Sequence, residues 1–129
     1  MTVAVDTNVL VRYLTWDDLA QAKAAARVIE SGETIAISTI VLCELVWVLR
    51  RPYGLSTTEI ADAIQEIIES RNVAVDRPAA ETGLELLRRG GDFADGIIRH
   101  DADQARCRHV ATFDREFAAL LGAGGVIPR

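Results

Sequence analysis

Hydrophobic positions along the chain form short continuous runs separated by longer segments with helical spacing. Short apolar runs, bounded by turn or cap residues, are typical of buried strands. Such runs predict strands at residues 3–5, 34–37, 72–75 and 109–112, and residues 125–127 could form a last strand. The chain therefore contains several short strands that are well separated in sequence.

The segments between these runs carry apolar residues every three or four positions, which predicts amphipathic helices. Helix starts and stops are also recognisable, because Ser56-Thr57-Thr58-Glu59 matches a capping box, Pro78 suits a first helical turn and Gly90-Gly91 suits a stop. The expected helices run through residues 10–13, 17–29, 40–49, 60–68, 78–87, 93–106 and 114–121.

Alternating strands and helices predict an α/β fold with a mostly parallel sheet that helices cover on both faces. The length of 129 residues fits one domain over residues 1–129. Polar sites in such sheets gather beyond the carboxyl ends of the strands. Asp6 and Asp114 both follow predicted strands directly, so a right-handed topology is expected to bring them together.

Composition narrows the class of protein. Half of the residues are hydrophobic and 26% are charged, as in a globular protein, and the net charge of −5 argues against a broad basic surface for nucleic acid unless acids are clustered around cations. Cys43 and Cys107 lack the spacing of a zinc site or of a disulfide scaffold. No basic leader and no apolar run near 18 residues is present, so we expect a cytoplasmic protein without a membrane span.

Glu44 is the most diagnostic acidic residue, because it stands alone in the strongly apolar segment 40–49. Its apolar neighbours leave little room for a fully solvated helix face, and a buried carboxylate needs a cation, a metal or a proton. We expect a site role, with a salt bridge to an arginine or a partly exposed position as the alternative.

The other candidate acids have ordinary structural explanations as well. Asp6 and Asp114 each precede a predicted helix and could simply cap it. Asp92 and Asp95 lie at the start of the helix at Phe93, where one could cap the helix while the other projects from its first turn; Asp95 could also form a ladder with Arg99 and Asp103. A cap or a ladder explains each of these acids taken singly, but the occurrence of the whole set is harder to explain in this way.

Carboxylates that converge repel one another unless a divalent cation supplies compensating charge. Ligands that are all oxygen atoms favour Mg²⁺ or Mn²⁺ over zinc, and Mg²⁺ keeps waters that can attack a phosphate. The acid set therefore predicts metal-dependent hydrolysis of a phosphodiester.

Four fragments in register give the chain a resemblance to the PIN domain, specifically to the VapC-type toxin ribonucleases of bacterial toxin–antitoxin pairs. They are Val5-Asp6-Thr7-Asn8-Val9-Leu10, Glu44 in its apolar helix, Phe93-Ala94-Asp95-Gly96 and Thr112-Phe113-Asp114-Arg115. The resemblance covers nearly the whole chain. After Asp95, however, the family continues with small and apolar residues, whereas this chain has the charged stretch 99–104, which we expect to be a solvated face.

The resemblance implies a three-layer α/β/α sandwich and RNA cleavage that depends on Mg²⁺ or Mn²⁺. By carry-over, Asp6, Glu44, Asp95 and Asp114 bind or position the metal and activate water. Asn8 and Thr112 are supporting polar residues, and Asp92 is an auxiliary acid. A homodimer and a cognate VapB-type antitoxin that covers the acidic site are also implied.

Other protein classes fit less well. A haloacid-dehalogenase phosphatase needs a second Asp two positions after the first, where this chain has Asn8, and a receiver domain needs a late lysine, whereas Lys23 is the only lysine. The main alternative is a PIN-like binding module for RNA or protein without catalysis. Neither the RNA substrate nor its cleavage site follows from the sequence.

Overall fold

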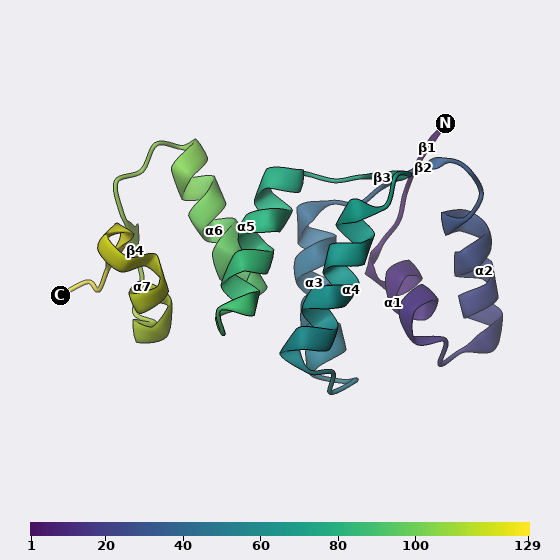
Figure 1. Cartoon of the computed structure of the whole chain (residues 1–129), viewed down its shortest axis with the longest axis horizontal. Coiled ribbons are helices and arrows are strands. Elements are labelled where there is room, and N and C mark those ends of the chain that lie inside the picture. Colours follow the sequence, from purple (N-terminus) through teal and green to yellow (C-terminus); the bar gives the residue numbers. More distant parts are fainter. The chain divides into compact units, whose positions relative to one another are not determined.

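A computed structural model describes the whole chain, Met1–Arg129, as two compact units (Figure 1). Unit 1 comprises Met1–Asp76 and unit 2 comprises Arg77–Arg129. The boundary follows the third strand, so each unit combines helices with parallel strands.

Unit 1 contains a three-stranded parallel sheet in the order β1-β2-β3. Its strands are β1 (Thr2–Ala4), β2 (Thr34–Ala36) and β3 (Val73–Ala74). Ala4 pairs in register with Ala36, and Ala36 with Ala74, so the three strands reach the same level at their carboxyl ends. The residues that follow the strands therefore leave the sheet at one edge.

Four helices complete unit 1, and a side chain caps each of them. They are α1 (Thr7–Thr15), α2 (Leu19–Ile29), α3 (Thr39–Arg50) and α4 (Thr57–Glu69). The caps satisfy backbone N–H groups that have no partner inside the first turn. The core consists of apolar side chains of these helices and of β2, including Val11, Ile35, Leu42, Leu45, Leu49, Ile60, Ile64 and Ile68.

The capping box at the start of α4 is confirmed. Ser56 Oγ accepts the backbone N–H of Glu59 at 3.1 Å, and Glu59 Oε1 accepts the backbone N–H of Ser56 at 3.0 Å. We expect Ser56→Ala to lower the free energy of unfolding by about 1 kcal/mol, because one N–H loses its acceptor. Urea denaturation measures the change. Thr58→Ala, which removes an exposed hydroxyl on the same turn, is the control and should not destabilise the protein.

Unit 2 begins with two helices, α5 (Arg77–Arg88) and α6 (Phe93–Gln104), and ends with a small parallel pair of strands. The pair consists of β4 (Val110–Ala111) and β5 (Gly125–Val126), which α7 (Arg115–Leu121) and a 3₁₀ turn, η1 (Gly122–Gly124), connect. As in unit 1, polar residues follow the carboxyl end of a strand, here β4.

Two glycines let α5 and α6 approach closely. A Cβ on Gly96 would lie 2.5 Å from Gly83 Cα and 2.5 Å from the carbonyl oxygen of Thr82, and a Cβ on Gly83 would lie 2.6 Å from the Phe93 ring. Phe93 has no exposed surface. Glycine is therefore required at both positions, and this crossing holds the first turn of α6 against α5.

The predicted elements are all present, with differences of one to three residues at their ends. The α/β class with parallel strands is confirmed, since every strand pair is parallel. The sequence did not predict η1, which consists of glycine and alanine only. None of the seven helices combines the length and apolarity that crossing a bilayer requires. The prediction of a single domain stays a prediction.

Candidate functional site

Asp6 lies just beyond β1 and is the N-cap of α1. Its Oδ1 atom accepts the backbone N–H of Val9 at 3.4 Å, and the side chain is exposed. The capping explanation is thus correct for Asp6, and one carboxylate oxygen does not take part in this bond. A capping aspartate at a strand end can therefore also serve as a ligand.

Glu44 is exposed on the surface of unit 1, so the expectation that its apolar neighbours keep it from solvent is wrong. The reason is angular. Consecutive side chains point in different directions around a helix, separated by 100° per residue. Glu44 therefore lies on the same side of α3 as Ile40 and Trp47. Those two side chains are 69% and 60% exposed, whereas Leu42 on the opposite face is fully buried. The partly exposed alternative for Glu44 therefore holds within this unit.

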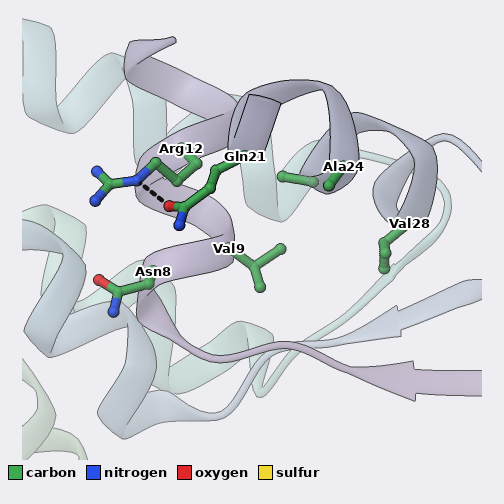
Figure 2. Close-up of a pocket in the computed structure, with 7 residues that line it drawn as sticks. Asn8, Val9, Arg12, Gln21, Ala24 and Val28 are labelled. Atoms are coloured by element: carbon green, nitrogen blue, oxygen red, sulfur yellow. Dashed lines mark hydrogen bonds between the residues drawn. The ribbon is translucent and has the colours of Figure 1, made fainter. Parts of the chain in front are cut away.

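Asn8 lies two residues after Asp6 and borders a pocket of about 250 Å³ between α1 and α2 (Figure 2). Apolar side chains of both helices form most of its wall, among them Val9, Ala25 and Val28. Arg12 Nε donates to Gln21 Oε1 at 2.7 Å along one side. Asn8 is exposed at the edge of the pocket, and its supporting role at the site stays a prediction.

Arg12 also belongs to a polar network that the sequence did not reveal. Its Nη1 atom donates to Tyr53 Oη at 3.1 Å, and Tyr53 Oη donates to Asp17 Oδ2 at 2.5 Å. Hydrogen bonds from Tyr53 and Thr15 hold the pKa of Asp17 below its ordinary value, and the charge of Arg12 adds to this effect. Tyr53 thereby ties the loop after α3 to the end of α1.

In unit 2, Asp92 and Asp95 have different roles at the start of α6, one as the cap and the other as a side chain of the first turn. Asp92 is the N-cap, with Oδ1 accepting the backbone N–H of Ala94 at 3.4 Å. Asp95 projects from the first turn and is partly buried. Its expected alternative, a ladder with Arg99, does not form, because Arg99 Nη1 lies 3.8 Å from Glu85 Oε1 on α5 instead. No structural partner therefore accounts for the Asp95 carboxylate.

Asp114 is the N-cap of α7, where its Oδ1 atom accepts the backbone N–H of Phe117 at 3.0 Å. Thr112 Oγ1 accepts the backbone N–H of Asp114 at 3.0 Å. The segment after β4 is thus held by two local hydrogen bonds. Thr112 thus fixes the backbone at Asp114, and its supporting role at the site stays a prediction.

Two of the candidate acids of unit 2, Asp92 and Asp114, act electrostatically on the third, Asp95. The pKa of Asp95 is raised above its ordinary value, chiefly by burial and then by the negative charges of Asp92 and Asp114. Asp95 in the first turn of α6 is therefore within electrostatic range of Asp114, which follows β4. Burial and repulsion together make it unfavourable for Asp95 to carry its charge without a cation.

Asp114→Asn is expected to lower the pKa of Asp95 towards its ordinary value, because one repelling charge is removed while asparagine keeps the cap. Burial, the larger cause, keeps the pKa above ordinary. Since the folded-state pKa is raised, the stability that Asp95 contributes is present below its unfolded pKa and is lost as pH rises through the folded pKa. NMR titration of the carboxyl carbon measures the shift; Asp101→Asn, on the exposed end of α6, should leave it unchanged.

The four predicted ligands are divided between the units, with Asp6 and Glu44 in unit 1 and Asp95 and Asp114 in unit 2. No group of three or more His, Cys, Asp or Glu side chains in the structure is arranged to hold a metal ion. The convergence of all four acids thus stays a prediction. The donor chemistry around Asp95 consists of carboxylate oxygens, which suit a hard divalent cation.

Gly96 is a site-forming residue whose role the sequence did not explain. It follows Asp95 directly, and its missing side chain permits the close crossing that positions the first turn of α6. The sequence offered one indication of this close crossing, namely a glycine in each of the two helices, Gly83 in α5 and Gly96 in α6.

Comparison with known proteins identifies the family. No curated protein matches the chain. The PIN domain family matches residues 3–121, which include all seven predicted site residues and extend over both units. This match bears out the predicted three-layer α/β/α, PIN-like class. The chain belongs to the PIN domain family.

Proposed function

We propose that this protein is a Mg²⁺-dependent ribonuclease that hydrolyses phosphodiester bonds of RNA. PIN domains are generally nucleases, so the family match supports nuclease activity. The observation that carries the proposal is the raised pKa of Asp95 beside Asp92 and Asp114. Acids without a cationic partner, at the carboxyl end of a strand and the start of a helix, are typical of a site that binds a cation.

We assign the metal-binding and catalytic roles to Asp6, Glu44, Asp95 and Asp114, with Mn²⁺ as a possible substitute for Mg²⁺. When bound, the metal supplies an activated water and stabilises charge on the phosphate. Asn8 and Thr112 support the site by positioning polar groups at Asp6 and Asp114, and Asp92 caps α6 so that Asp95 is held in its first turn. In this proposal the two units make up one PIN domain.

The finer biological assignment rests on the VapC resemblance. We propose that the protein is the toxin of a type II toxin–antitoxin pair, acts in the cytoplasm as a homodimer and is inhibited by a cognate VapB-type antitoxin that covers the acids. Co-expression with a small neighbouring gene product tests this. A stable complex that blocks RNA cleavage supports the assignment, whereas cleavage unaffected by any such partner contradicts it.

The nuclease proposal is tested by mapping RNA cleavage in Mg²⁺ and in EDTA. Cleavage is expected in Mg²⁺ and should disappear with EDTA and in Asp6→Asn, which keeps the cap because asparagine also caps helices. Lys23→Gln, an exposed change on α2, should retain full activity. RNA binding without turnover under any metal would favour the alternative, a PIN-like binding module.

A further inference from the structure

The far end of α6 carries a second polar feature, separate from the acids at its beginning. Between Asp95 and Gln104 the helix extends about 14 Å, at 1.5 Å per residue. A pocket of about 170 Å³ lies at this end, between α6, the loop before β4 and the 3₁₀ turn η1. Its charged and polar lining comes from Arg99, Asp103, Cys107, Arg108 and His109.

This pocket has unused hydrogen-bond donors. Arg99 reaches Glu85 only at 3.8 Å, and no salt bridge in the structure engages Arg108 or its exposed neighbour Arg106. Arg99 and Arg108 both line this pocket, and Asp103 is the single acid in its lining; Glu85 partly compensates Arg99, which leaves Arg108 as the cation without an acidic partner. The guanidinium fork is well suited to the oxygens of a phosphate group.

We propose that this pocket binds a backbone phosphate of single-stranded RNA at a distance from the bond that is cleaved. Arg99 and Arg108 donate to the phosphate oxygens, and Asp103 accepts a hydrogen bond from a ribose 2′-hydroxyl, which favours RNA over DNA. The charged stretch 99–104, expected to be a solvated face, thereby gains a role. The inference rests on the proposed function for its choice of ligand.

Fluorescence anisotropy with a 12-nucleotide single-stranded RNA tests the proposal, using the full chain with Asp95→Asn to prevent cleavage. Adding Arg108→Glu should weaken binding about tenfold or more and reduce the slope of log Kd against log salt by about 1. Arg27→Glu, an equal charge change on α2, is the control. An unchanged Kd in Arg108→Glu, or an equal loss in Arg27→Glu, overturns the proposal.

A second measurement separates this inference from the proposed function. With the otherwise native chain, Arg108→Glu should lower kcat/KM for the 12-nucleotide RNA but not for a dinucleotide, whose one phosphodiester is the bond to be cleaved. Equal losses on both substrates overturn the distal site. If no chain cleaves RNA but Arg108→Glu still weakens binding, the proposed catalysis fails while the pocket stands.

Two further variants complete the test. Thermal unfolding of each variant shows whether it is folded. If the charge reversal in Arg108→Glu prevents folding, Arg108→Ala replaces it in both measurements. DNA of the same sequence should bind more weakly than RNA, and Asp103→Ala should reduce this difference. Equal affinity of the parent chain for DNA and RNA overturns the part assigned to Asp103.

Discussion

Asp95→Asn should reduce the rate of RNA cleavage in Mg²⁺ by at least about 100-fold, because the substitution removes a charge from the proposed metal site but keeps the shape of the side chain. The same variant should raise the melting temperature of the metal-free protein at neutral pH. Burial and the charges of Asp92 and Asp114 disfavour the ionised carboxylate, and asparagine carries no charge. Loss of activity with a gain in stability is the expected pair of results.

These two results together distinguish a site residue from a structural one. Single-turnover cleavage and thermal unfolding in EDTA measure them, with Asp101→Asn on the same helix as the control that should change neither. Cleavage within about threefold of the parent protein, a difference of less than 1 kcal/mol, would contradict the role of Asp95. A lower melting temperature would instead indicate that Asp95 stabilises the fold.

Gly96→Ala should lower the free energy of unfolding by about 1–3 kcal/mol or more, because overpacking at a close helix crossing must displace one helix. The added methyl group would meet backbone atoms of α5, Gly83 Cα and the Thr82 carbonyl oxygen, both at 2.5 Å. Backbone cannot move aside as a flexible side chain can. Since this crossing positions Asp95, the proposed cleavage activity should fall as well.

Urea denaturation measures the loss of stability, and Gly124→Ala is the matched control. No atom lies within 4 Å of a Cβ built at Gly124, so that variant should be close to the parent protein. If Gly96→Ala unfolds at the same urea concentration as the parent, α5 and α6 do not cross as closely as the structure shows.

Much of the local structure followed from the sequence because it depends on short-range chemistry. The capping box at Ser56 and Glu59, the cap at Asp92 and the helical spacing of α4 involve groups within a few residues of one another. A pattern of a few neighbouring residues is therefore sufficient to predict such interactions. The acids Asp6, Asp92 and Asp114 were also placed correctly at helix starts for this reason.

For Glu44, the apolar residues next to it in the sequence led to a wrong prediction of its exposure. Its sequence neighbours are apolar, but exposure depends on the direction of each side chain around the helix, and Glu44 shares the exposed direction of Ile40 and Trp47. The fully buried residues of the segment, Leu42, Leu45 and Leu49, point in other directions around the helix. The apolar composition of the segment did not indicate this, because apolar residues occur on the exposed side of α3 as well.

By itself, the sequence determined the order of helices and strands, the residues at their caps and the membership of acids in a recognisable set. Only the tertiary structure decided which groups influence one another across segments, such as Asp95 with Asp114, Gly96 with Gly83, and Arg12 with Tyr53. The physical reason is that burial, repulsion and close approach depend on distances between residues that are far apart in the chain. Local propensity does not encode those distances.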